Sequence, residues 1–142
     1  MENTRRRLLW HGVFLFLLGL ITGLVEPKFA NPRMGLAAHL EGVMNGILLL
    51  SFGAVWEHIK LNGRVKVVVY WAALYGTYAN WGFTTIAAIM GTGALSPITG
   101  AGHSGKPWQE ILVAGGFKSV GLAVIGVSLS LLWGLRRGTT SS

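Results

Sequence analysis

The sequence has 142 residues, of which 51% are hydrophobic and only 12% are charged, with a formal net charge of +7. A soluble domain carries about 25% charged residues, so this chain lacks the polar side chains for an ordinary water-facing surface. The absence of cysteine excludes disulfides, thiolate nucleophiles, zinc–thiolate sites and iron–sulfur clusters. The basic residues stand at the ends of apolar runs, which favours contact with anionic lipid headgroups over nucleic acid.

Four apolar runs predict four transmembrane helices, over residues 8–25, 35–56, 67–90 and 111–135. Each run has about 18 residues or more, enough to cross roughly 30 Å of hydrocarbon, and all four prolines fall between runs. We therefore expect an all-α integral membrane four-helix bundle, with residues 1–142 as one transmembrane domain. A cleaved signal peptide is the alternative for the first run, but no convincing small-x-small cleavage site follows it.

The positively charged residues predict the orientation of these spans. The three loops and ends on one side carry Arg5, Arg6, Arg7, Lys60, Arg64, Lys66, Arg136 and Arg137. The two loops on the other side carry Lys28, Arg33 and Lys106. This excess of eight over three predicts that both termini are cytoplasmic, in a multi-pass protein of the inner (plasma) membrane.

Small residues recur four apart within the runs, as in Gly19 with Gly23 and Gly42 with Gly46. Such spacing lets helices approach closely in lipid. The same pattern fits ordinary packing within one chain and contact between copies of the chain, and the sequence leaves both open.

One glycine-rich segment matches a nucleotide-binding motif only in part. Residues 100–106 fit the first seven positions of a P-loop, but Pro107 stands where a magnesium-binding Ser or Thr is required. The chain has no Asp that would hold the metal from a second strand. Nucleotide binding is therefore rejected, and the segment is expected to form an outer cap over the helices.

Ionisable and amide side chains at membrane depth are the candidates for function, because burying them in lipid is costly. Glu41 and Asn45 are four residues apart and share one face of a helix. His39 lies six residues before Asn45, about 240° away around the helix, so the two cannot easily serve one compact pocket in a single subunit. Asn80 is expected to point inward, either to a site or to a structural interhelical hydrogen bond.

Four segments together resemble a known family: residues 10–12 (WHG), 31–46 (NPRMGLAAHLEGVMNG), 75–81 (YGTYANW) and 100–110 (GAGHSGKPWQE). In this order they resemble the membrane-bound hydroxylaminobenzene mutases, which rearrange arylhydroxylamines to ortho-aminophenols. The resemblance runs over nearly the whole chain and implies an isomerase, of use in nitroaromatic degradation.

A more distant similarity is to the styrene oxide isomerases, which are trimeric four-helix membrane proteins holding haem b on a histidine of the second helix. Their spacing of His and Asn recurs as His39 and Asn45, and their third-helix Asn recurs as Asn80. This similarity implies haem b with His39 as the iron ligand, in a homotrimer. Their Asp and Tyr that flank the third-helix Asn are replaced by Gly76 and Thr84, which argues against epoxide opening by the same site.

The expected reaction begins with cleavage of a weak N–O bond, and hydroxide is a poor leaving group unless an acid or a metal assists it. Iron held by His39 is the expected Lewis acid, and Glu41 the candidate proton donor. Asn45 is expected to hydrogen-bond the substrate, and Tyr78 and Trp81 to stack on its ring.

Two other functions remain open at this point: an epoxide isomerase of the styrene oxide type, and a small membrane subunit that holds haem or lipid without chemistry. The expected partners are a small aromatic substrate, membrane lipid and other copies of the chain, with no nucleic acid and no nucleotide.

Overall fold

The computed structural model describes residues 2–136, and every regular element in this part of the chain is a helix. The all-α prediction is therefore confirmed for the described residues. The elements are α1 (Glu2–Val25), η1 (Glu26–Lys28), α2 (Pro32–Val55), η2 (Trp56–His58), α3 (Gly63–Met90), α4 (Pro97–Gly100) and α5 (Pro107–Arg136).

Local sequence signals set the ends of the central helices. Asn31 precedes α2, and its side-chain oxygen accepts hydrogen bonds from the backbone N–H groups of Arg33 and Met34, at 3.1 and 3.2 Å. Asn62 caps α3 in the same way, through the N–H of Val65 at 2.9 Å. Gly91 follows the last residue of α3 and caps the helix, and its φ of 67° is in the left-handed region that glycine adopts without strain.

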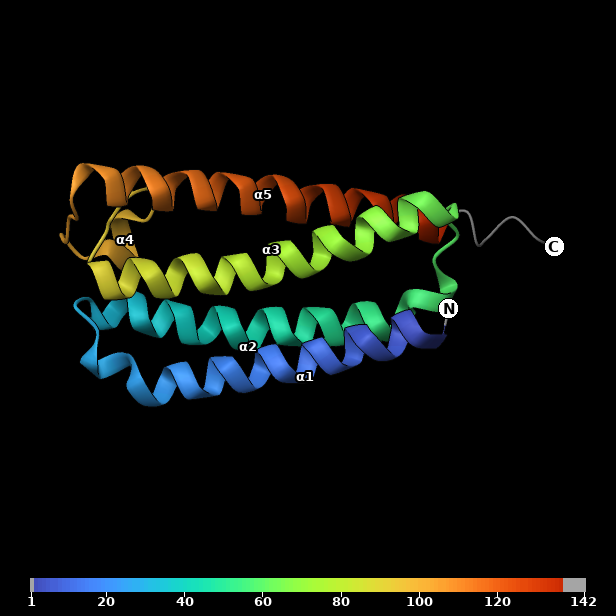
Figure 1. Cartoon of the computed structure of the whole chain (residues 1–142), viewed down its shortest axis with the longest axis horizontal. Coiled ribbons are helices and arrows are strands. Elements are labelled where there is room, and N and C mark those ends of the chain that lie inside the picture. The colour runs from blue at the N-terminus through green and yellow to red at the C-terminus, as the bar shows by residue number, and fades with distance from the viewer. Residues whose placement is uncertain (1, 137–142) are drawn as a thin grey trace.

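The four long helices lie side by side and pack in the order in which they occur in the chain (Figure 1). α1 packs on α2, α2 on α3, and α3 on α5. α1 and α5 therefore lie at opposite edges of the molecule. The short helix α4 lies at the end of the molecule opposite to the N-terminus (Figure 1).

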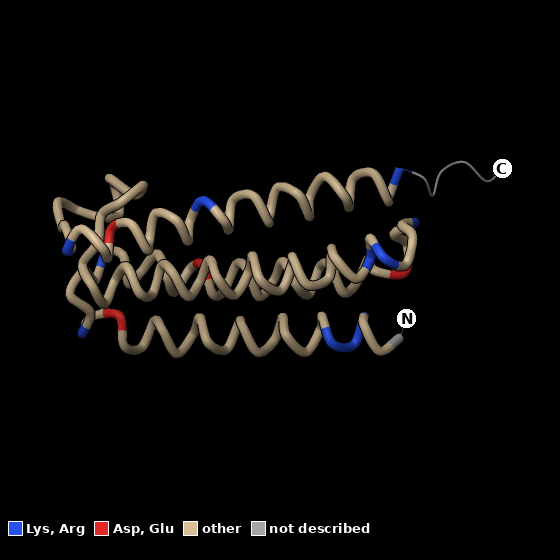
Figure 2. Tube along the Cα trace, turned by 45° about the horizontal axis from the view of Figure 1, so that its top comes forward, with Lys and Arg blue, Asp and Glu red and all other residues tan. Residues whose placement is uncertain are grey.

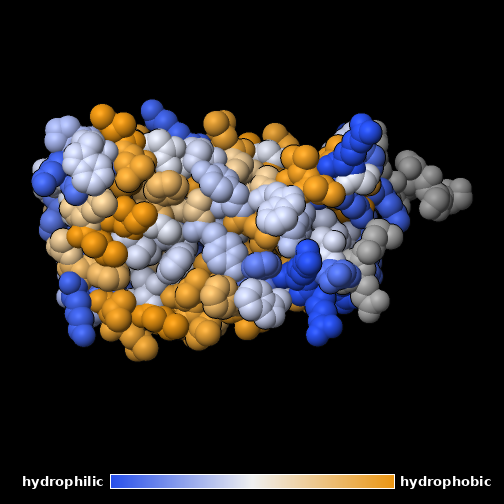
Figure 3. Space-filling view, in the orientation of Figure 1, coloured by the Kyte–Doolittle hydropathy of each residue, from blue (hydrophilic) through white to orange (hydrophobic). Residues whose placement is uncertain are grey.

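Three helical segments in the described residues are long and apolar enough to cross a membrane: residues 3–28, 32–58 and 107–136. Large apolar side chains cover their outer surfaces, and Leu24 and Leu122 are 80% and 77% exposed. Hydrophobic side chains occur along the length of the visible face, and the most hydrophilic ones gather toward its ends (Figure 3). A surface of this kind is suited to lipid rather than water.

The third predicted span corresponds to α3, which has 28 residues but is not among the three candidate spans. Its second half is rich in hydroxyl, amide and aromatic side chains, which lowers its hydropathy. The prediction of four spans is thus supported for three of them. The orientation rests partly on Arg137, which lies outside the described residues, so the cytoplasmic termini stay a prediction.

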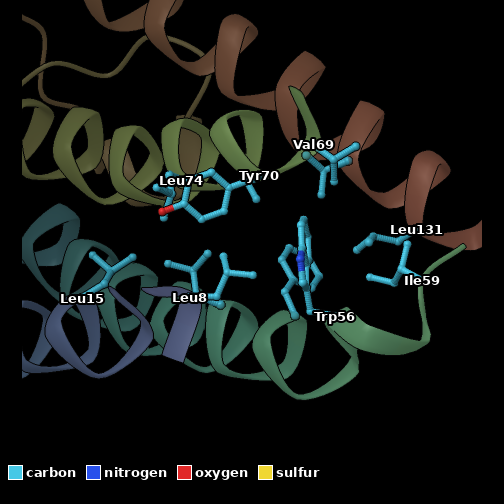
Figure 4. Close-up of a cluster of buried hydrophobic side chains, with 12 residues drawn as sticks. Leu8, Leu15, Trp56, Ile59, Val69, Tyr70, Leu74 and Leu131 are labelled. Atoms are coloured by element: carbon cyan, nitrogen blue, oxygen red, sulfur yellow. The ribbon is translucent and has the colours of Figure 1, made fainter. Parts of the chain in front are cut away.

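The main core joins the two pairs of helices near the N-terminal end of the molecule (Figure 4). Trp56, Tyr70 and Leu74 are 3%, 7% and 7% exposed, and they meet Leu8 from α1 and Leu131 from α5. A second, smaller cluster around Met34, Ala88 and Val113 packs the opposite end. These clusters hold α2 and α3 in one fixed rotation relative to each other.

Glycines bring α1 and α2 into direct backbone contact. A Cβ added to Gly12 would lie 2.8 Å from the backbone nitrogen of Leu50, and one added to Gly46 would lie 2.6 Å from that of Phe16. The glycine spacing in the first two spans therefore serves packing within the chain. Gly126 differs, because a Cβ there would meet nothing within 4 Å.

We expect Gly12→Ala to lower the melting temperature of the detergent-purified protein, because overpacking costs about 1–3 kcal/mol. Gly126→Ala is the matched control, and it should leave the melting temperature unchanged or raise it, since alanine favours helix. Circular dichroism melts of the two variants test this. Equal melting temperatures would contradict the close α1–α2 contact.

Candidate active site

A cavity of about 350 Å³ lies among α2, α3 and α5 and is roofed by the segment around α4. Small-molecule sites usually have volumes of about 300–1,000 Å³. Its lining residues are Met34, Ala37, Glu41, Asn80, Thr84, Leu95, Ser96, Thr99, Phe117, Val120 and Gly121. Glu41 is the one charged side chain in this lining, which combines the polar residues Asn80, Thr84, Ser96 and Thr99 with apolar ones.

The Glu41 carboxyl group is held by two amides through one of its oxygens. Asn45 Nδ2 donates to Glu41 Oε2 at 3.0 Å and to the Glu41 backbone carbonyl at 2.8 Å. Asn80 Nδ2, from α3, donates to the same Oε2. No hydrogen bond to Oε1 occurs within the described residues, so this oxygen is the one available to a bound molecule.

Asn45 and Asn80 both bond Glu41, but only one of them lines the cavity. Asn80 lines the cavity beside Glu41, whereas Asn45 is only 6% exposed and is not part of the lining. Asn45 therefore positions Glu41 from behind, and the expected hydrogen bond from Asn45 to a substrate has no support in this arrangement. Thr84, one turn after Asn80, lines the cavity and donates its hydroxyl to the Asn80 carbonyl at 2.7 Å.

His39 lies on a different face of α2 from Glu41, as the sequence spacing requires. Its Nδ1 is 2.8 Å from the Gly19 carbonyl oxygen on α1, and a Cβ at Gly23 would lie 2.6 Å from the same nitrogen. His39 thus packs into the α1–α2 contact and does not line the cavity. This is the geometry of a histidine bonded to a neighbouring helix.

Tyr78 and Trp81 also lie away from the cavity, on the face of α3 that meets α1. Tyr78 Oη is 2.9 Å from Nδ1 of His11, and its ring contacts that of Phe14. Trp81 Nε1 donates to the Thr22 hydroxyl at 3.0 Å. These contacts join α1 to α3. Neither ring lines the cavity of its own chain, so stacking of the two rings on a substrate stays a prediction.

The roof of the cavity is fastened at two points that the sequence reasoning did not assign. Glu110, in the first turn of α5, accepts the backbone N–H groups of Gly93, Ala94 and Gly105 at 3.1, 2.8 and 2.7 Å. Asn31 Nδ2 donates to the Thr99 and Gly100 carbonyls at 2.9 and 3.0 Å. Asn31 and Glu110 lie within two of the segments that resemble the mutases, residues 31–46 and 100–110, and this was the only sequence signal that could have marked them.

Phe117 is the aromatic side chain that the structure places in the cavity wall. It was not among the predicted site residues, because the apolar run of α5 gives no sign of which side faces α2 and α3. The glycine-rich segment predicted to be an outer cap does supply Leu95, Ser96 and Thr99 to the cavity.

The described residues contain no group of three or more His, Asp or Glu side chains that could hold a metal ion. A haem differs from such a site because one axial imidazole is enough to attach it. When a neutral histidine donates its Nδ1–H to a backbone carbonyl, its Nε2 carries no proton and can bind a metal. The 2.8 Å contact of His39 Nδ1 with Gly19 O is compatible with that arrangement, and His39 as a haem ligand stays a prediction.

The comparison with known families decides the assignment. The family model described as styrene oxide isomerase matches residues 4–136. The chain belongs to this family. Hydroxylaminobenzene mutase HabB of Ectopseudomonas oleovorans is 46% identical over 132 residues, covering 92% of this chain and 80% of that protein. Hydroxylaminobenzene mutase HabA of the same organism is 42% identical over 127 residues, covering 89% and 94%. No solved structure matches.

These findings confirm the resemblance expected from the sequence segments and the enzyme class, an isomerase. They also agree with the membrane character of the helices, since three of them have the length and apolarity of spans. The match with HabA covers 94% of that protein. The family model covers residues 4–136, so the cavity and the segment around α4 lie within the matched region.

We expect Glu110→Gln to loosen the roof, because an amide cannot replace a carboxylate that accepts three backbone N–H groups, and hydrogen bonds to charged groups contribute about 1.5–3 kcal/mol each. Hydrogen–deuterium exchange at Gly93, Ala94 and Gly105 should rise. Glu57→Gln is the control, since the exposed Arg5–Glu57 ion pair contributes little. Unchanged exchange in Glu110→Gln would contradict the fastening role.

Proposed function

We propose that the protein rearranges an arylhydroxylamine to an ortho-aminophenol within the membrane. The observation that carries this proposal is the Glu41 carboxyl group, which lines an otherwise uncharged cavity and is anchored through Oε2 by two amides, while Oε1 forms no hydrogen bond with the described residues. Mutases of that substrate class, HabB and HabA, are 46% and 42% identical to the chain.

The cavity suits a neutral aromatic molecule that enters from the bilayer. Met34, Leu95, Phe117 and Val120 offer apolar contact to a benzene ring. Asn80 and Thr84 supply polar groups beside Glu41, and Ser96 and Thr99 supply hydroxyl groups from the segment around α4. A bound arylhydroxylamine would therefore place its N–O group toward the carboxyl and its ring toward the apolar wall.

Glu41 would act first as an acid and then as a base. Its proton passes to the hydroxyl oxygen, the N–O bond breaks, and water leaves with both bonding electrons, so that the ring and nitrogen carry the positive charge. The water oxygen then bonds to the ortho carbon, and one of its protons returns to Glu41. The proton on the ortho carbon moves to the nitrogen, which restores the aromatic ring and gives the amine. No oxidant or reductant is consumed. Positioned acid–base groups of this kind contribute about 10²–10⁴-fold to rates.

The two amides and the roof set the outcome of the reaction. Asn45 and Asn80 fix the direction of Oε1, and the roof keeps the released water beside the ring. Because the ortho carbon is nearer to the nitrogen than the para carbon, confinement favours return at the ortho position.

We further propose haem b, with His39 as the residue that holds it. When bound, ferric haem supplies a Lewis acid for the hydroxyl oxygen. His39 faces α1 rather than its own chain's cavity, so the group would serve a site completed by a neighbouring copy. This arrangement accords with a homotrimer, which is proposed on the distant similarity to the trimeric isomerases.

The membrane arrangement is proposed to include α3 as a fourth span, giving a four-helix bundle with both termini on the cytoplasmic side of the inner membrane. α3 has 28 residues, against 24 in α2 and 30 in α5, and it lies between these two helices. Its polar side chains would face the cavity and α1 rather than lipid, which explains how a less hydropathic helix crosses.

We expect purified protein to convert phenylhydroxylamine to 2-aminophenol, as followed by chromatography of the product. Glu41→Gln should lower kcat about 10²–10⁴-fold, because the proton donor is lost. Asn80→Ala should lower kcat more than Thr84→Ala does, because Asn80 contacts the carboxyl group. Full activity of Glu41→Gln would remove the carboxyl from the mechanism. Turnover of styrene oxide without any turnover of phenylhydroxylamine would favour the epoxide reaction instead.

The haem proposal has its own test. His39→Ala should lose the Soret absorbance and the activity while still inserting into the membrane. His103→Ala is the control, because His103 is exposed in the roof segment and bonds only the nearby Gly100 carbonyl; it should keep the Soret band. Wild-type protein made with ample haem, lacking Soret absorbance yet fully active, would refute the cofactor and leave Glu41 as the catalyst.

A further inference from the structure

A second cavity, of about 340 Å³, lies between the first turns of α1 and of α3. This second cavity is at the end of the molecule that holds the N-terminus. α4 and the roof of the Glu41 cavity lie at the other end (Figure 1). The residues that matter for its chemistry are three polar ones, Thr4, Arg7 and Lys66, and three aromatic ones, Trp56, Tyr70 and Trp71.

The cavity carries two positive charges without a matching acid. Arg5 pairs with Glu57 at 3.4 Å, whereas neither Arg7 nor Lys66 forms an ion pair with the side chains that the structure describes. Lys66 Nζ lies 5.9 Å from the centroid of the Trp56 ring, which places its ammonium group against the aromatic wall. Lys and Arg lie at both ends of the helices, and this end holds the larger share (Figure 2). The site is therefore electrostatically suited to an anion.

The cavity continues into an exposed apolar stripe on α3. Val67 and Trp71 belong to the lining and are 58% and 61% exposed, and Tyr75 follows at 48%. These residues are four apart, so they lie on one face of the helix. The stripe runs from the charged end of α3 toward its middle, which is the direction from a headgroup toward an acyl chain.

We propose that this cavity binds the phosphate group of an anionic phospholipid, with one acyl chain along the stripe of Val67, Trp71 and Tyr75. Arginine and lysine are the side chains that bind phosphate most strongly. Tryptophan and tyrosine are typical of the level of the lipid headgroups. A free phosphate ion offers the same charge, but it would leave the apolar stripe without an occupant. The site is separate from the roofed cavity, and it does not depend on the reaction proposed there.

The test compares four probes on the protein in a neutral detergent: phosphatidylglycerol, phosphatidylcholine, dioleoylglycerol and inorganic phosphate. Native mass spectrometry measures retained lipid, and thermal melting measures stabilisation by each probe. We expect wild-type protein to retain phosphatidylglycerol at least about tenfold more strongly than phosphatidylcholine or dioleoylglycerol. Stabilisation by inorganic phosphate equal to that by phosphatidylglycerol would overturn the lipid assignment, as would equal retention of the three lipids.

Two double variants distinguish lipid binding at this cavity from non-specific attraction by the positive surface charge. Arg7→Gln with Lys66→Gln removes the cations of the cavity, and Arg6→Gln with Arg64→Gln removes two exposed cations at the same end that do not line it. The net charge changes equally, so we expect only the first variant to lose the phosphatidylglycerol preference, by about tenfold. Equal loss in both variants would overturn the proposal. The lipid comparison on wild-type protein decides the matter if the first variant fails to fold.

Discussion

The hydrogen bonds of Glu41 with Asn45 and Asn80 are the constraint on which the rest of the site depends. A carboxyl group at membrane depth is costly unless it has polar partners. Because one partner is on α3, the bonds fix the rotation of α2 against α3. That rotation decides which residues line the cavity, and it leaves His39 to the α1–α2 contact.

The helix boundaries were readable from the sequence because they follow composition. Apolar runs over residues 35–56 and 67–90 correspond to α2 (Pro32–Val55) and α3 (Gly63–Met90), and the added residues at their starts are explained by caps at Asn31 and Asn62. The cavity could be predicted only in part. Glu41 and Asn80 stood out as polar groups in apolar runs, but contacts between helices depend on rotations that one sequence does not give.

The prediction that Tyr78 and Trp81 contact the substrate placed residues from two different faces of α3 in one site. Tyr78 and Trp81 are three residues apart and face α1, whereas Asn80 is two residues after Tyr78, about 200° around the helix. Helical periodicity alone argues against one pocket for all three. The position of Phe117 required the structure, because it depends on how α5 lies against α3.

Packing in chain order has a consequence for how the protein is made. Helices that contact their neighbours in sequence can assemble one after another during synthesis, with little search for distant partners. The hydrogen bond from Asn80 to Glu41 can form only after α3 has been synthesised. Asn45 is on the same helix as Glu41, so it can donate its hydrogen bond as soon as α2 forms. Asn45 thus protects a nascent hairpin of α1 and α2 from carrying an unpartnered carboxyl group into the bilayer.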